Sequence, residues 1–129
     1  MRTAWDLMIA GCVVAVMLLA QIGEAASLDD ALAQAKKEGK IVMLELGSVG
    51  CIPCEQMRPV MQRLSRDYPG KLEVIFVDIK VDREAGRKFG VFGIPTQVFL
   101  DRNGKEFSRH VGFYSYEDIR AKVLKKMGL

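Results

Sequence analysis

The chain is short of the side chains that build closed metal sites. Its 129 residues include three cysteines and a single histidine, His110, whereas a structural zinc site takes four Cys or His ligands. Cys12 lies in an apolar N-terminal segment, which leaves Cys51 and Cys54 to the rest of the chain. We therefore expect neither a structural zinc site within one chain nor any other metal or cofactor.

The sequence also lacks a block of like charge. The net charge is +3, and the basic residues are spread along the chain, with Lys125 and Lys126 as the only late cluster. Arms that bind nucleic acid are runs of like charge, so no nucleic-acid partner is expected. The length suits one compact domain and is too short for two. We expect that domain to span residues 26–129.

The first 25 residues differ from the remainder. Arg2 precedes an uncharged run from Leu7 to Ile22, and the small residues of Gly23–Ala26 follow soon after. This order is typical of an export signal that ends at a peptidase site. The run is shorter than the roughly 20 apolar residues of a spanning helix. Residues 1–25 are predicted to be a signal peptide, with a retained membrane anchor as the alternative, and both place the domain in the periplasm or another extracytoplasmic compartment.

The rest of the chain alternates helical and strand patterns. Apolar residues at helical spacing predict helices, and short β-branched apolar runs predict strands. In chain order the patterns predict a helix over 28–38, a strand over 40–47, a helix over 54–68, a strand over 71–79, a helix over 82–90, strands over 96–101 and 105–111, and a helix over 115–127. The fold class is therefore α/β, with a mixed sheet of about four strands and helices on both faces.

His110 belongs to the last predicted strand. In "KEFSRHV" it alternates with Arg109 and Val111 and falls with the polar set. Alternation of this kind places one set of side chains in solvent. We therefore predict a solvent-facing histidine.

Cys51 and Cys54 flank Ile52 and Pro53 just after the first predicted strand. The pair is a redox centre, half of a metal site or a structural staple. A bridge across so small a loop removes little entropy from the unfolded chain, and the other metal ligands are missing. Backbone N–H groups at a helix N-terminus stabilise a thiolate, and Pro53 suits the first helical turn. Cys51 is the predicted nucleophile, and Cys54, one turn inside the helix, the resolving thiol.

Several short motifs together resemble the thioredoxin superfamily over roughly residues 28–129. They are "CIPC" at 51–54, Pro59, "GIPT" at 93–96, "DRNG" at 101–104 and "VG" at 111–112. The resemblance implies a thioredoxin-like three-layer fold. The first strand of a full thioredoxin is missing, because too few residues lie between the N-terminal segment and the first predicted helix.

The resemblance also assigns roles to residues outside the cysteine pair. It implies that Ile94–Pro95 is a cis peptide facing the cysteines, and that the backbone of Ile94 pairs with an extended substrate segment. Gly50, Ile52 and Pro53 complete the expected substrate-binding set. Gly50 stands where family members typically carry Trp, which indicates a more open loop.

Glu45 falls where thioredoxins carry a buried acid, usually Asp, behind the second cysteine. Burial would raise its pKa, and it would then accept the proton of Cys54. A surface or salt-bridged glutamate is the alternative. The Lys that family members often place near this acid is replaced by Phe76.

The expected function is a thiol–disulfide oxidoreductase that reduces protein disulfides outside the cytoplasm through Cys51 and Cys54. Ile-Pro between the cysteines and Ile before Pro95 look more like reducing thioredoxins than strong periplasmic oxidants. The expected partners are exported proteins with disulfides, apocytochromes among them, and a membrane electron-transfer protein as reductant; the protein is expected to be a monomer. The alternatives are an exported disulfide oxidase or isomerase, and a thioredoxin-fold binding or assembly module with a non-catalytic disulfide.

Overall fold

The computed structural model describes residues 26–129. The predicted signal or anchor, residues 1–25, lies outside the described residues. Within the described part, no helix has the length and apolar character needed to cross a membrane. The elements in chain order are α2 (Leu28–Lys37), β1 (Ile41–Gly47), α3 (Ile52–Asp67), β2 (Leu72–Asp78), α4 (Arg83–Lys88), β3 (Thr96–Leu100), β4 (Glu106–Val111), α5 (Tyr116–Lys122) and the 3-10 turn η1 (Leu124–Met127).

The strands form one sheet in the order β2-β1-β3-β4. β1 and β2 are parallel, because α3 carries the chain back across the sheet, and the other two pairs are antiparallel. The predicted mixed sheet is therefore confirmed. Its register places Glu45 of β1 between Phe76 of β2 and Gln97 of β3. Directly paired residues point to the same face, so these three side chains form one row across the sheet.

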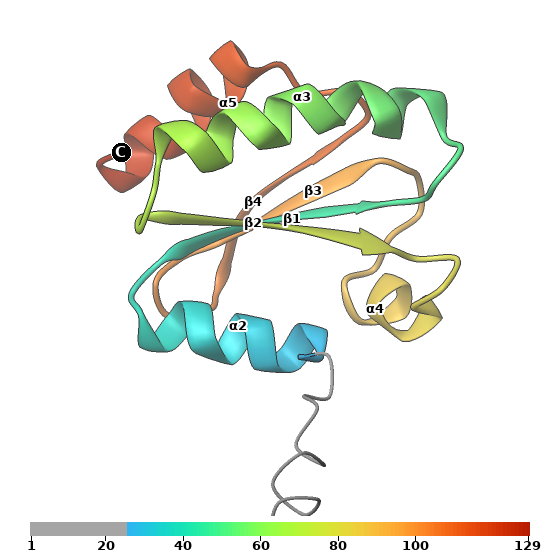
Figure 1. Cartoon of the computed structure of the whole chain (residues 1–129), viewed down its shortest axis with the longest axis horizontal. Coiled ribbons are helices and arrows are strands. Elements are labelled where there is room, and N and C mark those ends of the chain that lie inside the picture. The colour runs from blue at the N-terminus through green and yellow to red at the C-terminus, as the bar shows by residue number, and fades with distance from the viewer. Residues whose placement is uncertain (1–25) are drawn as a thin grey trace, which may run out of the picture.

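Helices cover both faces of this sheet, as Figure 1 shows, with α3 and α5 on one side and α2 and α4 on the other. Alternate residues of β1 supply the two cores, because successive side chains of a strand point to opposite faces. Ile41 and Met43 pack with α3 and α5, whereas Val42, Leu44 and Leu46 pack on the other face. The structure is the three-layer α/β arrangement that the sequence predicts, and Glu45 belongs to the α3 face.

Short polar side chains fix the beginnings of three helices. Ser27 caps α2 and forms a capping box with Asp30, while Asp82 caps α4 and Ser115 caps α5. Each capping oxygen accepts a hydrogen bond from a backbone N–H that has no partner inside its helix. These caps account for the close agreement between the predicted and observed helix starts.

The C-terminal helix differs from its prediction. A single helix was expected over 115–127, but α5 ends at Lys122, and η1 follows after Val123, the C-cap residue of α5 with φ −114° and ψ −64°. Val123 and the next residue, Leu124, are both buried in the core that also contains Ile119. A tighter 3-10 turn is common at helix ends, and here two adjacent apolar side chains enter one core.

The prediction of a solvent-facing His110 is wrong. The register between β3 and β4 shifts by one residue beside Phe99 and Leu100. A bulge of this kind interrupts the alternation of faces. His110 is consequently half-buried and stacks on Tyr114 with ring centroids 4.0 Å apart, while Val111 is 59% exposed.

Candidate active site

The two thiols lie at the start of α3. Cys51 is the N-cap residue, and the N–H of Glu55 donates to its carbonyl at 2.9 Å. A disulfide joins Cys51 to Cys54, and their Cα atoms are 5.2 Å apart. Cys54 is 4% exposed, whereas Cys51 is only half-buried. Cys51 is therefore the sulfur that a large partner reaches first.

The disulfide packs against the end of β1. A Cβ atom built on Gly47, the last residue of β1, would lie 3.0 Å from Cys54 Sγ. The sulfur of Cys54 therefore packs directly against Gly47, where a larger side chain would displace it. Glu45 is two residues earlier on β1, and residues at this spacing share one face. Glu45 and the sulfur of Cys54 therefore lie on the same side of the sheet, the α3 side.

The Ile94–Pro95 peptide bond is cis and comes directly before β3. Thr96, the first residue of β3, pairs with Leu46 near the end of β1, so this bond lies at the same end of the sheet as the cysteine loop. The carbonyl of Pro95 accepts a hydrogen bond from the N–H of Gly112 at 2.7 Å. No backbone hydrogen bond within residues 26–129 uses the N–H or carbonyl of Ile94.

Glu45 is fully buried. Its Oε1 accepts a hydrogen bond from Gln97 Nε2 at 3.4 Å, and its Oε2 has no hydrogen-bond partner in the described part of the chain. Burial raises the pKa of Glu45 to about 7, and the hydrogen bond from Gln97 acts in the opposite direction. The predicted burial is confirmed, and the alternative of a surface or salt-bridged glutamate is wrong.

Comparison with known proteins places this arrangement in a family. The model of the thioredoxin-like domain matches residues 28–127. The chain belongs to the thioredoxin-like family. A thioredoxin of Staphylococcus aureus is 30% identical over 97 residues, which cover 75% of this chain and 91% of the relative.

Solved thioredoxin structures agree with this assignment. A poplar thioredoxin h superposes with a TM-score of 0.68 at 25% identity, covering 78% of this chain and 88% of the other. A Fasciola hepatica thioredoxin gives 0.67 at 26% identity, covering 78% and 94%. The fold, together with the Cys51–Cys54 pair, supports thiol–disulfide oxidoreductase activity.

Gly50 has a physical role in the cysteine loop of this thioredoxin-like protein. Its φ of +81° lies in the left-handed region, where a residue with a Cβ is strained. The loop is anchored on both sides of Gly50, because the N–H of Cys51 donates to Ser48 at 3.4 Å and that of Val49 donates to Asp78 at 3.1 Å. The backbone conformation at position 50 therefore favours glycine over the Trp that the family resemblance leads one to expect there.

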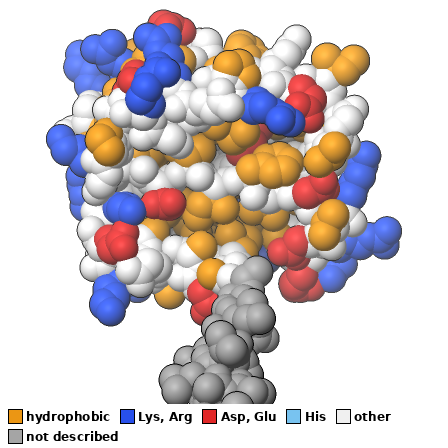
Figure 2. Space-filling model, in the orientation of Figure 1, with side chains coloured by type: hydrophobic (Ala, Val, Ile, Leu, Met, Phe, Trp, Pro, Cys, Tyr) orange, Lys and Arg blue, Asp and Glu red, His pale blue; other side chains and the backbone are white. Residues whose placement is uncertain are grey.

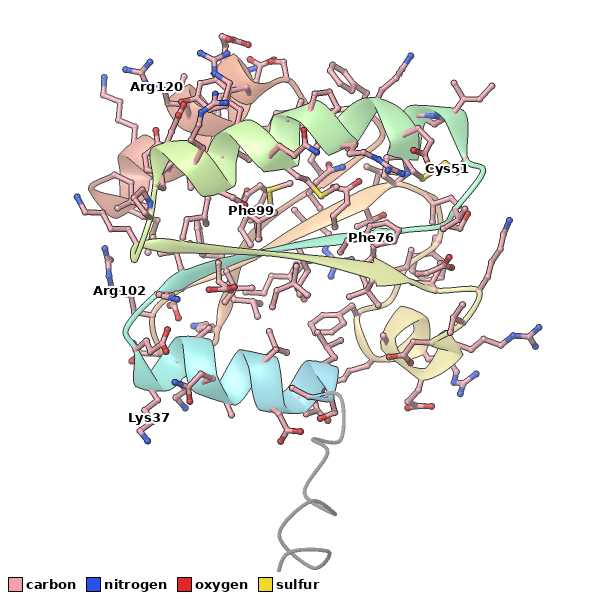
Figure 3. The ribbon with its side chains drawn as sticks, viewed as in Figure 1. Lys37, Cys51, Phe76, Phe99, Arg102 and Arg120 are labelled. Atoms are coloured by element: carbon pink, nitrogen blue, oxygen red, sulfur yellow. A yellow bond between two sulfur atoms is a disulfide. The ribbon has the colours of Figure 1, made fainter. Side chains whose placement is uncertain are left out.

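Phe76 and Gln97 flank Glu45 on its two neighbouring strands. Figure 3 shows Phe76 at the same end of the molecule as Cys51, with Phe99 farther along in the core between α3 and the sheet. Phe76 is 44% exposed and offers the carboxylate no charge. No ion pair within residues 26–129 includes Glu45.

Gln97 is a buried site residue that the sequence analysis missed. Its Nε2 also donates to the carbonyl of Gly112 at 3.1 Å, so one amide contacts both Glu45 and the segment that follows β4. The available signal was a glutamine inside the apolar run "TQVFL". A buried amide requires hydrogen-bond partners, and this requirement alone points to a polar neighbour.

The raised pKa of Glu45 predicts a pH-dependent stability. The folded protein binds this proton more tightly than the unfolded chain, whose carboxyl has a pKa of 4.5. The free energy of unfolding should therefore fall as the pH rises from 4.5 to about 7, by roughly 3 kcal/mol in total. Urea unfolding of the disulfide form at about pH 5 and pH 8 measures this change.

Glu45→Gln is the control for this prediction, because it removes the titration and keeps the shape of the side chain. The variant should lose most of the difference between the two pH values. An equal pH dependence in both proteins would contradict an elevated pKa at Glu45.

Proposed function

We propose that this thioredoxin-like protein reduces protein disulfides outside the cytoplasm through Cys51 and Cys54. The observation that carries the proposal is the half-buried Cys51 at the N-terminus of α3, joined to a buried Cys54 whose sulfur lies against Gly47, two residues from Glu45 on β1. Thiolate stabilisation at a helix N-terminus favours attack by Cys51. A buried acid whose pKa burial raises to about 7 suits a proton acceptor near neutral pH.

The reaction proceeds in two exchanges. The Cys51 thiolate attacks one sulfur of the substrate disulfide, a mixed disulfide forms, and the other substrate sulfur leaves with the electron pair. Cys54 then passes its proton to Glu45 and attacks Cys51 Sγ, which releases the second substrate thiolate. The substrate gains two electrons, and the protein is left with the Cys51–Cys54 disulfide.

Exposed apolar side chains near the redox pair support a protein substrate. Val49 and Ile52 flank Cys51 in sequence, and Phe92 lies two residues before Ile94; they are 69%, 75% and 103% exposed. Figure 2 shows separate hydrophobic side chains at the end of the molecule where α3 begins. With the backbone of Ile94, which has no backbone hydrogen-bond partner within residues 26–129, they suit an extended apolar segment that carries a disulfide. Gly50 and Pro53 complete the proposed binding set.

The proposed setting follows from residues 1–25, whose sequence pattern is that of an export signal or membrane anchor. Exported proteins with disulfides, apocytochromes among them, are then the substrates. A membrane electron-transfer protein would return Cys51 and Cys54 to the thiol form, and the protein would act as a monomer.

Reduction of insulin disulfides by dithiothreitol tests the activity. The protein should accelerate the reaction, and Cys51→Ser should abolish the acceleration because it removes the attacking sulfur. In the full chain of 129 residues, Cys12→Ser makes the same chemical change at the remaining cysteine and should leave the rate unchanged. Equal rates for Cys51→Ser and the unchanged protein would contradict the proposal and favour a binding module with a non-catalytic disulfide.

A further inference from the structure

A chain of hydrogen bonds links Glu45 to the segment around Pro95. Gln97 Nε2 donates to Glu45 Oε1 at 3.4 Å and to the carbonyl of Gly112 at 3.1 Å. The N–H of Gly112 in turn donates to the carbonyl of Pro95 at 2.7 Å. The buried acid and the proposed docking backbone beside Ile94 are therefore joined through a single amide side chain.

The chemistry of its two partners fixes the orientation of the Gln97 amide. A backbone carbonyl only accepts hydrogen bonds, so the group that faces Gly112 has to be the NH₂. The same NH₂ offers its second hydrogen to the carboxylate of Glu45. Both hydrogen bonds of the Gln97 side chain are donated by Nε2, and its Oε1 has no hydrogen-bond partner in the described part of the chain.

Glu45 is held on one oxygen only. Oε1 accepts from Gln97, while Oε2 is buried and has no hydrogen-bond partner among residues 26–129. A carboxylate fixed in this way keeps one oxygen available to take up a proton. Cys54, whose sulfur rests on Gly47 two residues along β1, is the neighbouring proton donor on this face.

We propose that Gln97 is a positioning residue for disulfide exchange, which orients the Glu45 carboxylate, stabilises its ionised form and ties it to the segment around Pro95. This inference rests on the proposed function, in which Glu45 accepts the proton that leaves Cys54 Sγ. The thiolate electron pair then forms the bond to Cys51 Sγ, and the substrate sulfur departs with the pair of the broken bond. Gln97 neither gains nor loses a proton.

Other titratable groups on the elements around Glu45 have to be separated from it. They are Asp78 on β2, His110 on β4, Tyr114 beyond β4, Cys51 at the N-cap of α3, and Cys54 and Glu55 on α3. The N–H groups of Val49 and Lys80 hold the pKa of Asp78 below its usual range, so Asp78 stays ionised near neutral pH. Glu55 pairs with Arg58 at the surface. His110 is the group to control, because it pairs with Gln97 in the register.

The test is the pH dependence of the second exchange step. The Cys51–glutathione mixed disulfide of the full chain is prepared, and release of glutathione is followed after a pH jump. In the unchanged protein the rate should rise through a pH of about 7. Gln97→Met keeps the side-chain length but removes the donor, and should move this midpoint up by about one pH unit. At pH 7 the rate should then fall about fivefold, and above pH 9 the two proteins should agree.

Three variants separate the possible causes. His110→Asn should leave the midpoint unchanged. Glu45→Gln should remove the rise of the rate near pH 7. Adding Gln97→Met to Glu45→Gln should have no further effect on the pH profile. If the rate of Glu45→Gln still rises near pH 7, the proposed role of Glu45 is overturned. If the rise of the rate near pH 7 is lost in Glu45→Gln but keeps its midpoint in Gln97→Met, only the positioning role of Gln97 is overturned.

A measurement on the unchanged protein keeps the inference testable if Gln97→Met does not fold. The side-chain ¹⁵N–¹H₂ resonance of Gln97 should titrate with the midpoint of the rate profile, because its partner changes charge. The titration should be absent in Glu45→Gln and present in His110→Asn. A Gln97 resonance that does not respond to pH across this range would contradict the inference.

Discussion

Replacing Cys54 by serine is expected to arrest the protein as a mixed disulfide with its partners. Cys51 is the more exposed sulfur and can still attack, but the buried thiol that completes the exchange is gone. Steady-state insulin reduction should fall by about 1,000-fold or more, because an external thiol lacks the effective molarity of a neighbouring group. Non-reducing electrophoresis of cell extracts, followed by mass spectrometry of the retained proteins, measures the trapping.

Cys51→Ser is the matched control for this experiment, since it removes one sulfur from the same loop. It should retain no partner, and the double variant Cys51→Ser/Cys54→Ser should behave in the same way. Retention of the same proteins by Cys51→Ser would show that the attacking thiol is Cys54. Absence of covalent partners in the Cys54→Ser sample, with insulin reduction intact, would refute the exchange mechanism.

Glu45→Gln is expected to slow the second exchange step by about 100-fold near pH 8, the lower end of what a positioned general base contributes. Glutamine has nearly the same shape, and its Oε1 can still accept the hydrogen bond from Gln97. The loss would therefore come from the missing proton acceptor. Stopped-flow measurement of glutathione release from the Cys51 mixed disulfide isolates this step.

Glu73→Gln is the matched control for the glutamate substitution. Glu73 lies on β2 and pairs with Lys40 at 2.9 Å, away from the cysteine loop. Its replacement should leave the rate of the exchange step unchanged. Equal rates for Glu45→Gln and the unchanged protein would show that Cys54 loses its proton to another acceptor.

The sequence predicts most of the fold because local signals and the global arrangement agree. Capping residues such as Ser27 and Ser115 mark helix starts, and the Asn103–Gly104 turn marks the β3–β4 hairpin. The bulge in that hairpin leaves no comparable signal, and for this reason the orientation of His110 was predicted wrongly. The split at Val123 was missed because its side chain fits the helical pattern equally well.

Only part of the candidate site could be predicted from the sequence, because only some of its residues carry a local sequence signal. Cys51 and Cys54 are marked by their spacing, whereas the burial of Glu45 was expected only from the family resemblance. Gln97 is one residue of an apolar strand, and its partners Glu45 and Gly112 are distant in sequence. Only the strand register brings these groups together, so a residue that acts through them is invisible until the register is known.

The reduction potential of the Cys51–Cys54 couple tests the central claim most directly. Equilibrating the full chain with glutathione mixtures and counting free thiols gives this potential. A reductase requires a value near or below about −270 mV, the region of thioredoxins, and this is the result we predict. A value near about −120 mV, typical of a strong oxidant, would contradict the account, because the couple would then withdraw electrons from its partners.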